Sequence, residues 1–456
     1  MEYQNALSKL ASAFGDQLTT VKSVRETHGQ GEGHQKNCPP DAVLFAISTE
    51  DVATAVRICA AHKMPIIPYG AGSSLEGHVS APKGGLSINL SKMNKVLALN
   101  ALDMDVRIEP GITRKQLNQH LRDQGLFFPV DPGADATIGG MVATRASGTN
   151  AVKYGTMREQ ILSLKVVTPT GTIIETGTRA KKSAAGYDLT HLYCGSEGTL
   201  GIITEATLKL HPIPEKIAAG VCCFPDLESA INTVISVMQS GIGISRIELL
   251  DVLSIKAVNG YSKTNHKEAA TLFLEFSGTN AAVAEQIETC KAIANDFNGA
   301  DIEFAENQEA INKLWHARHQ LYYATRALAP GKESITTDVC VPISQLADCM
   351  LETREDLTSS GLVATMLGHV GDGNFHTIIL FDADAADEIA QVTELSEGMA
   401  KRAIAMGGTC TGEHGIGCGK QTYLEWERGN AVDIMRSVKT ALDPDNIMNP
   451  GKIFRG

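Results

Sequence analysis

The pattern of hydrophobic and polar positions switches repeatedly between the period of a strand and the period of a helix. The apolar run 42–47 has the length of a buried strand, and the alternating stretches within 86–109 predict strands with one buried face. Apolar residues at helical spacing follow Ser48 and Thr49, and either of these side chains suits the N-cap position of a helix. The first half of the chain is therefore expected to mix helices and strands.

A proline-rich break at 212–215 separates this part from a second series of elements. Beyond it the periodicity predicts strand, helix, strand, strand, helix, strand, which is the order of a ferredoxin-like α+β unit. Long amphipathic stretches then predict a helix over about 307–328 and another at 385–406. The predicted elements of the ferredoxin-like unit are 218–224, 227–240, 245–250, 271–276, 281–297 and 301–304.

Length and charge restrict the class of protein. A chain of 456 residues exceeds one ordinary hydrophobic core, so two or more domains are expected. A net charge of −12 argues against nucleic acid or an anionic membrane as the main partner. Ten cysteines without a CxxC pair indicate reduced thiols, and neither a transmembrane run nor a signal-peptide core is present in the sequence. We therefore expect a cytoplasmic protein, or one lying peripherally at the inner face of the membrane.

The stretch Gly368–His376 predicts a β-hairpin, because β-rich apolar segments flank the turn residues Gly371–Asn374. With those four residues as the loop, His369 faces His376, and their Cβ atoms lie about 5 Å apart on one face. Two imidazoles held in this way suit a single metal ion. The alternative is a polar hairpin tip whose histidines contact only water.

The glycine-rich loop 407–417 places an acid beside a third histidine. Glu413 is able to complete a site of two histidines and one carboxylate that leaves coordination positions open for a substrate. Since adjacent side chains diverge, His414 can reach the same substrate as a general base. The alternative is a solvated loop that reverses the chain between a helix and a strand.

The predicted helix over 307–328 carries Arg318 three residues after Trp315, with two tyrosines close behind. An arginine beside aromatic residues is a good bidentate ligand for a carboxylate. A surface salt bridge would explain the same residues equally well.

Three glycine-rich segments lie between residues 69 and 201. In the segment 70–77, successive backbone N–H groups can form a nest for a pyrophosphate. It is not a Rossmann fingerprint, because Leu75 occupies the position of the third glycine. The other two segments, 131–156 and 195–201, are rich in small residues against which a flat ligand can lie. Together they predict a dinucleotide-sized ligand.

Taken together, these motifs resemble those of one family. Residues from about 42 to 456 are similar to the FAD-dependent D-2-hydroxyacid dehydrogenases of the vanillyl-alcohol oxidase type, and most of all to those of the cytochrome-linked D-lactate type. The segments that carry the resemblance are 69–77, 137–140, 147–150, 195–201, 337–344, 368–376, 411–415 and 449–452.

The resemblance implies an α+β fold with a two-subdomain PCMH-type FAD-binding domain over 1–215 and a ferredoxin-like cap domain for the substrate over 216–420. Residues 421–456 would return to the FAD-binding domain. FAD would be held without a covalent bond, although some relatives use a histidine for which His78 is the nearest candidate here. The implied FAD-binding residues are Tyr69, Gly70, Ala71, Gly72, Ser73, Ser74, Pro132, Thr137, Gly139, Gly140, Ser147, Gly148, Asn150, Gly155, Glu197, Gly198, Ile203 and Asn449.

The resemblance also implies roles in catalysis. His369, His376 and Glu413 would bind a divalent metal, zinc or manganese, His414 would be the base, and Arg318 would bind the substrate carboxylate. The implied reaction is oxidation of a D-2-hydroxy acid, with electrons passing to a quinone, a cytochrome or an electron-transfer flavoprotein, and the assembly is expected to be a homodimer.

The choice of substrate depends on the position two residues after the second hairpin histidine. Relatives that act on D-2-hydroxyglutarate have a polar residue there, whereas this chain has Ile378. An apolar site leaves a second carboxylate unpaired, which is costly. We therefore expect D-lactate, oxidised to pyruvate, with the flavin subunit of glycolate oxidase and D-2-hydroxyglutarate dehydrogenase as alternatives.

Overall fold

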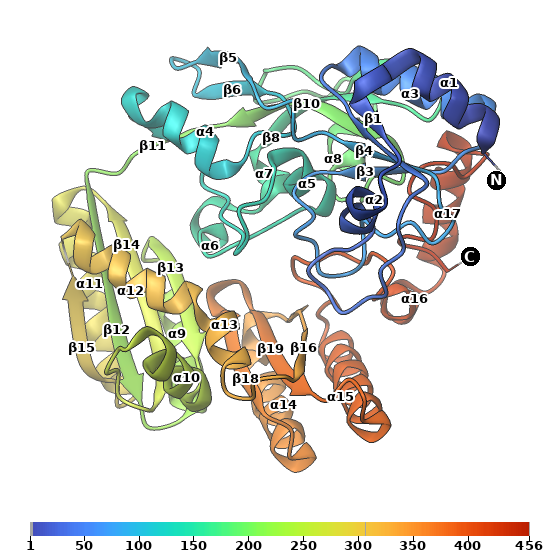
Figure 1. Ribbon diagram of the computed structural model, residues 1–456. Coiled ribbons are helices and arrows are strands. Elements are labelled where there is room, and N and C mark those ends of the chain that lie inside the picture. The colour runs from blue at the N-terminus through green and yellow to red at the C-terminus, as the bar shows by residue number, and fades with distance from the viewer. Residues whose placement is uncertain (1–2, 306, 456) are drawn as a thin grey trace. The chain divides into compact units, whose positions relative to one another are not determined.

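The computed structural model describes residues 3–305 and 307–455, and the chain divides into two compact units (Figure 1). Unit 1 comprises Met1–Ser147, Gly155–Ile213 and Glu413–Gly456. Unit 2 comprises Gly148–Tyr154 and Pro214–Gly412. Unit 1 therefore contains both the N-terminal and the C-terminal parts of the chain.

The first sheet of unit 1 has the strand order β1-β2-β4-β3. Strands β2, β4 and β3 are parallel, and the short β1 is antiparallel to β2. Helices α1 and α3 pack on this sheet through one apolar core, and Ser48 caps α3 by accepting from the N–H of Asp51. Strand β4 is buried along its whole length because it lies between β2 and β3, so the prediction of one exposed face was wrong for this strand.

The second sheet of unit 1 is antiparallel, with the order β5-β6-β10-β8-β9. The C-terminal segment also belongs to this unit. Met448 forms a parallel bridge with Ile66 at the first sheet, and the Lys439 ammonium donates to the carbonyls of Thr199 and Met448. Helix α16 was not predicted. The elements of unit 1 are α1 (Gln4–Phe14), β1 (Leu18–Thr19), α2 (Lys22–His28), β2 (Ala42–Phe45), α3 (Thr49–Ala61), β3 (Ile66–Tyr69), β4 (Leu86–Asn89), β5 (Val96–Asn100), β6 (Asp105–Ile108), α4 (Arg114–Leu121), β7 (Leu126–Phe127), α5 (Ile138–Thr144), α7 (Met157–Gln160), β8 (Ile161–Val167), β9 (Ile173–Glu175), α8 (Leu189–Tyr193), β10 (Ile202–Lys209), β11 (His211–Pro212), α16 (Gln421–Arg428) and α17 (Ala431–Leu442).

Unit 2 is built on an eight-stranded sheet with the path β15-β12-β14-β13-β18-β19-β16, and β17 pairs with β19. Its first four strands have the ferredoxin-like order that the sequence predicted, and the hairpin β18–β19 extends the sheet beyond β13. Helices α9, α11, α14 and α15 cover one face, while α10, α12 and α13 cover the other. The elements are α6 (Ala151–Tyr154), β12 (Lys216–Phe224), α9 (Leu227–Gln239), β13 (Ile244–Leu250), α10 (Val252–Ser262), β14 (Ala270–Gly278), α11 (Asn280–Asp296), β15 (Ala300–Ala305), α12 (Gln308–His319), α13 (Leu321–Arg326), β16 (Glu333–Thr336), β17 (Val339–Cys340), α14 (Leu346–Ser360), β18 (Ala364–His369), β19 (Asn374–Phe381) and α15 (Ala386–Ala405).

Several helices of unit 2 differ from the prediction. Helix α10, between the second and third strands of the ferredoxin-like unit, was not predicted, and neither were α6 and α14. The single helix expected over 307–328 is divided at Gln320, which ends α12 and precedes α13. The division leaves Arg318 in the last turn of α12, where its side chain is buried.

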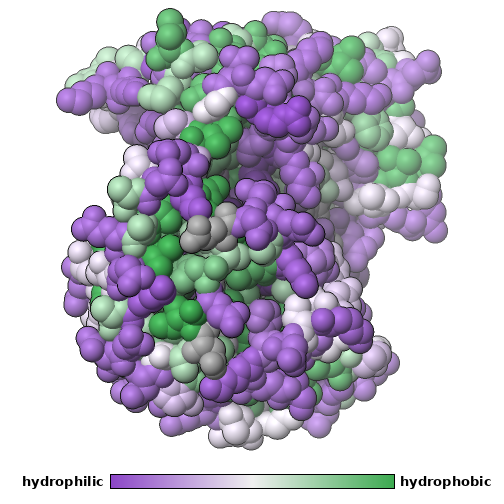
Figure 2. Space-filling model, turned by 90° about the vertical axis from the view of Figure 1, so that its left-hand side faces the viewer, coloured by the Kyte–Doolittle hydropathy of each residue, from purple (hydrophilic) through white to green (hydrophobic). Residues whose placement is uncertain are grey.

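The surface is mostly hydrophilic on the face that Figure 2 draws, with smaller groups of hydrophobic residues between the polar ones. Within the described ranges, none of the helices has the length and apolar character needed to span a lipid bilayer. None of the ten cysteines, which all lie within the described residues, forms a disulfide bond.

Candidate active site

The hairpin β18–β19 carries His369 and His376, as predicted, but the predicted pairing between its strands was wrong. His369 pairs with Asn374 and Leu367 pairs with His376, because a 3₁₀ turn over Val370–Asp372 closes the hairpin one residue earlier than expected. This changes each pairing by two residues, and side chains alternate between faces with a period of two. The histidines therefore remain on one face as diagonal neighbours, with ring centroids 5.4 Å apart.

Each of these histidines has its Nδ1 atom engaged by an acceptor. His376 Nδ1 lies 3.0 Å from the carbonyl oxygen of Thr337, and His369 Nδ1 lies 2.6 Å from Oε1 of Glu248. A carbonyl or carboxylate oxygen only accepts, so each Nδ1 carries the hydrogen and a neutral ring has its lone pair on Nε2. This is the tautomer that a metal-binding histidine needs.

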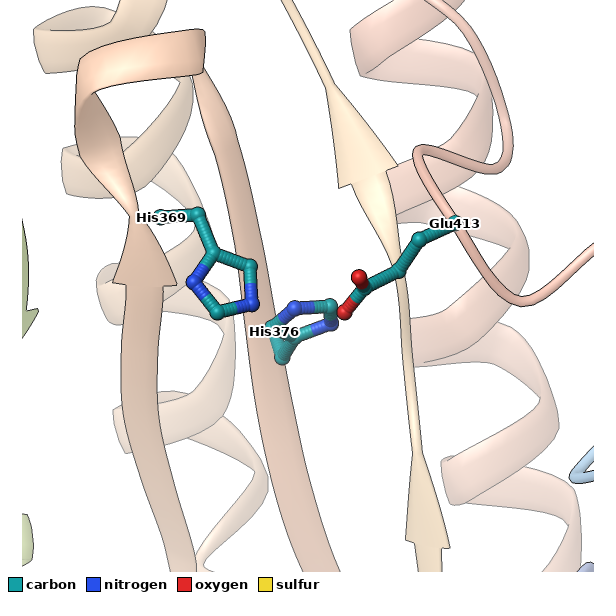
Figure 3. A group of neighbouring side chains, drawn as sticks. All are labelled: His369, His376 and Glu413. Atoms are coloured by element: carbon teal, nitrogen blue, oxygen red, sulfur yellow. The ribbon is translucent and has the colours of Figure 1, made fainter. Parts of the chain in front are cut away.

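Glu413 brings a carboxylate to the same two rings (Figure 3). One potential ligand atom from each of His369, His376 and Glu413 lies within 4.8 Å of the others. The peptide before Glu413 is held in place, because the Thr411 hydroxyl donates to Asp338 Oδ2 at 2.7 Å. Asp338 also accepts from the side chain of Asn374 at 2.8 Å, so the loop is tied to the hairpin. Two imidazoles and one carboxylate form a suitable donor set for zinc or manganese.

Behind His369 lies a buried ion pair between Glu248 and Arg318. Glu248 is fully buried on β13, and its Oε2 accepts from Arg318 Nε at 3.2 Å and from Nη2 at 2.6 Å. Burial raises the pKa of the Glu248 carboxyl. The charges and hydrogen bonds of His369 and Arg318 lower this pKa by more than burial raises it, so the net shift is downward. Sequence reasoning missed Glu248. Glu248 is the only acid in the predicted strand 245–250. Because an acid is rarely buried without a partner, its place between Ile247 and Leu249 could have indicated a buried ion pair.

The loop that follows His414 is fixed within unit 1. The backbone N–H groups of Ile416 and Gly417 donate to the two oxygens of Glu197, at 2.7 and 2.8 Å. Glu197 is buried, and His78 Nε2 lies 3.2 Å from its Oε2. Burial raises the pKa of Glu197, whereas His78 and the two backbone donors lower it, with a net downward shift. His414 itself is half-buried.

Several glycine-rich segments come together at the end of β3. A Cβ atom on Gly70 would lie 2.2 Å from Thr137 Oγ1, and one on Gly198 would lie 2.8 Å from the ring of Pro68. Asn449 joins them, because its side-chain amide donates to the carbonyl of Glu197 at 2.8 Å. The segment 69–74, Thr137, Glu197, Gly198 and Asn449 are thus neighbours within unit 1.

The remaining predicted FAD-binding residues are distributed over both units. Ile203 is buried in the core beside the second sheet of unit 1. Asn150 belongs to unit 2, where its Oδ1 accepts from Arg246 Nε at 2.9 Å. The others in unit 1 are Pro132, Gly139, Gly140, Ser147 and Gly155, and Gly148 lies in unit 2.

Comparison with known families identifies the two parts of the chain. Residues 40–177 match an FAD binding domain, and residues 213–453 match the C-terminal domain of FAD linked oxidases. The chain belongs to the family of FAD-linked oxidases. FAD is therefore its cofactor.

Two relatives in this family match almost the whole chain. The probable D-lactate dehydrogenase, mitochondrial, of Danio rerio is 49% identical over 456 residues, covering 99% of this chain and 92% of that protein. The mitochondrial D-lactate dehydrogenase [cytochrome] of Arabidopsis thaliana is 48% identical over 451 residues, covering 98% and 80%.

A solved structure shows the fold of this FAD-linked oxidase. p-Cresol methylhydroxylase with substrate bound aligns with a TM-score of 0.79 at 18% identity, covering 99% of this chain and 96% of that one. The expected α+β fold of the PCMH type, with a ferredoxin-like second domain, is confirmed.

The expected location was wrong. A cytoplasmic protein, or one at the inner face of the membrane, is contradicted by the relatives, since both of those described above are named as mitochondrial proteins. The inference had depended on the absence of hydrophobic targeting features, and composition alone does not determine a compartment.

The residues at the end of β3 are suitable for binding FAD. Ser74 Oγ and Asn449 Oδ1 are buried polar atoms that have no hydrogen-bond partner among the described residues. Buried polar atoms are rarely left unsatisfied, because this costs about 1–3 kcal/mol each. A hydroxyl and an amide oxygen are groups that can bond the phosphates, ribityl hydroxyls or ring N–H of a flavin nucleotide.

Proposed function

We propose that this protein is an FAD- and metal-dependent D-lactate dehydrogenase that oxidises D-lactate to pyruvate. The observation that carries the proposal is the group of His369, His376 and Glu413, which lies in a chain 48–49% identical to proteins named as D-lactate dehydrogenases. We further propose that residues 1–215 bind FAD, that residues 216–420 form the substrate-binding cap, and that residues 421–456 complete the FAD-binding domain.

Arg318 would bind the substrate carboxylate. A guanidinium has five N–H groups, and Glu248 accepts from the Nε and Nη2 atoms. Three N–H bonds remain, two on Nη1 and one on Nη2, and the adjacent pair from Nη1 and Nη2 can form two parallel bonds to a carboxylate. The Glu248 carboxylate fixes the plane of the guanidinium, so this edge keeps one direction.

His414 would take the proton of the substrate hydroxyl. When bound by His369, His376 and Glu413, a divalent metal ion, zinc or manganese, lowers the pKa of that hydroxyl. FAD supplies the acceptor for the hydride that leaves C2. We propose that FAD is held without a covalent bond. Electrons then pass to a quinone, a cytochrome or an electron-transfer flavoprotein, and the protein is expected to work as a homodimer.

Ile378 supports the choice of a short monocarboxylate. It follows His376 by two residues on β19, so both side chains lie on one face of the strand. Ile378 is buried in an apolar cluster that includes Trp315 and Leu367. A second carboxylate on the substrate would have to be desolvated beside this apolar surface.

The test is anaerobic mixing of the yellow protein with hydroxy acids. D-Lactate should remove the absorbance of oxidised flavin faster than L-lactate, glycolate or D-2-hydroxyglutarate, and acid precipitation should release the flavin into solution. Faster reduction by glycolate would indicate a glycolate oxidase flavin subunit instead. A flavin that no hydroxy acid reduces would overturn the proposed function.

A further inference from the structure

The fully buried carboxylate of Glu248 connects two parts of the candidate active site. Its Oε1 accepts from His369 Nδ1 at 2.6 Å, and its Oε2 accepts from Arg318. Glu248 lies on β13, whose partner β18 carries His369. These residues are 70 and 121 positions apart from it in the sequence, so only the fold brings them together.

We propose that Glu248 is a positioning residue that couples substrate binding by Arg318 to metal binding by His369. The proposal rests on the proposed function of these two side chains. Glu248 holds His369 with its hydrogen on Nδ1, which leaves Nε2 for the metal. The same carboxylate fixes the orientation of Arg318. A change in the position of Arg318 or of His369 therefore alters the position of the other side chain.

The chemistry of a carboxylate explains why no amide can replace it. Both neighbours of Glu248 are donors: Arg318 has only N–H groups, and His369 must donate from Nδ1 to keep its metal-binding tautomer. A carboxylate offers two acceptor oxygens, one for each neighbour. In the variant Glu248→Gln, the amide has one acceptor, so its NH₂ group faces one of the two donors.

Two arrangements of that glutamine are available, and both damage the site. With its NH₂ group toward Arg318, the arginine loses its partner and its fixed plane. With its NH₂ group toward His369, the ring must accept at Nδ1, which moves the hydrogen to Nε2 and removes the metal-binding lone pair. Glu248→Gln is thus expected to weaken both metal and substrate binding.

The experiment measures the two kinds of binding separately. Zn²⁺ affinity of the flavin-loaded protein is measured by competition with a chromogenic chelator, and KM for D-lactate is measured at saturating Zn²⁺. Glu248→Gln should weaken Zn²⁺ binding on the order of 10–100-fold, the effect usual for the second partner of a metal-binding histidine. Its KM should remain raised at saturating metal, while its flavin content stays at the wild-type level.

A matched control is Asp251→Asn. Asp251 is also a buried acid, directly after β13, and is also paired with an arginine, Arg354. It caps α10 by accepting from the N–H of Ser254 at 2.8 Å, and its backbone N–H donates to Met366 on β18. Its variant should keep wild-type Zn²⁺ affinity and KM. Equal losses in both variants would overturn the proposal, because they would indicate only a weakened sheet.

A second variant tests the coupling from the other end and serves if Glu248→Gln does not fold. Arg318→Lys replaces the planar partner of Glu248 with a point charge. Zn²⁺ binding should weaken in this variant although Arg318 is not a metal ligand. Wild-type Zn²⁺ affinity in both Glu248→Gln and Arg318→Lys would overturn the coupling. The measurement of Zn²⁺ affinity needs no turnover. Its result therefore tests the coupling whether or not the wild-type protein oxidises D-lactate.

Discussion

At the scale of single residues, a histidine acts as a ligand or as a base according to what surrounds its two nitrogens. His369 and His376 each have Nδ1 engaged by an oxygen that only accepts, which leaves the Nε2 lone pair of a neutral ring available to a metal. His414 is adjacent to the third ligand, Glu413, but is not part of the group of three whose ligand atoms lie together. This difference supports separate roles for the three histidines.

His414→Ala should therefore keep the metal and slow the reduction of flavin by D-lactate on the order of 10²–10⁴-fold, the usual effect of losing a general base. Elemental analysis and anaerobic stopped-flow absorbance measure the two effects. The comparison is His376→Ala, which should lose the metal. Loss of metal from His414→Ala, with metal retained in His376→Ala, would mean that the two roles had been exchanged.

Sequence reasoning identified the residues whose chemistry is visible in local motifs and missed the one whose role depends on distant partners. The histidines and Glu413 lie in short glycine-containing stretches that predict turns. Glu248 lies between Ile247 and Leu249 on a strand, where a polar residue ordinarily faces solvent. Its burial follows from Arg318 and His369, which the fold brings to the same place.

At the scale of elements, most helices and strands follow from periodicity, whereas pairing registers and buried strands do not. The hairpin was predicted, but its turn begins one residue earlier because Gly373 adopts a left-handed φ of +76° after the 3₁₀ turn. Strand β4 alternates in sequence, yet Ser87 within it is fully buried. Neighbouring strands decide such burial, and they are not local in sequence.

The hairpin turn allows a test at this scale. A Cβ atom on Gly373 would lie 2.0 Å from the carbonyl oxygen of Val341, and that backbone contact is difficult to relieve. Gly373→Ala should lower both Tm and Zn²⁺ affinity, because the turn that positions both histidines must shift. Gly361 has a similar φ of +72° but no atom within 4 Å of its Cβ position. Gly361→Ala should cost only about 1–2 kcal/mol of unfolding free energy for its left-handed backbone, and should leave Zn²⁺ binding intact.

Differential scanning fluorimetry and chelator competition compare the two variants directly. The difference between them isolates the contact with Val341, since both lose the same conformational freedom. Equal Zn²⁺ affinity in the two alanine variants would contradict a role for the turn in positioning the histidines.

At the scale of the whole molecule, the order of elements predicted the ferredoxin-like sheet. The division of the chain into units was harder to predict from the sequence. Residues 148–154 belong to unit 2, although the chain on both sides of them belongs to unit 1. Their contacts explain this, because the Lys153 ammonium donates to the side chains of Ser245 and Ser277 on the sheet of unit 2. A seven-residue excursion of this kind leaves no signal in composition or periodicity.

The proposed pyrophosphate loop and the proposed metal ligands are separate segments of the chain, which predicts that flavin and metal can be lost independently. Gly72 lies in the proposed pyrophosphate loop of unit 1 with a φ of +75°, and a Cβ atom there would lie 2.2 Å from the Tyr69 hydroxyl. Gly72→Ala should therefore distort that loop and lower the FAD content of the purified protein, while His369, His376 and Glu413, which lie outside that loop, still bind Zn²⁺. His376→Ala should show the reverse, with full FAD content and no tightly bound metal.

Gly125→Ala is the matched control for the flavin loop, because Gly125 in unit 1 has a φ of +66° and no atom within 4 Å of its Cβ position. FAD content from absorbance after acid release, and metal content from elemental analysis, are measured on the same samples of all three variants. Loss of FAD from His376→Ala, or loss of metal from Gly72→Ala without unfolding, would contradict independent binding. The flavin site and the metal site would then form only together, and protein without flavin would have no metal site to which a hydroxy acid could bind.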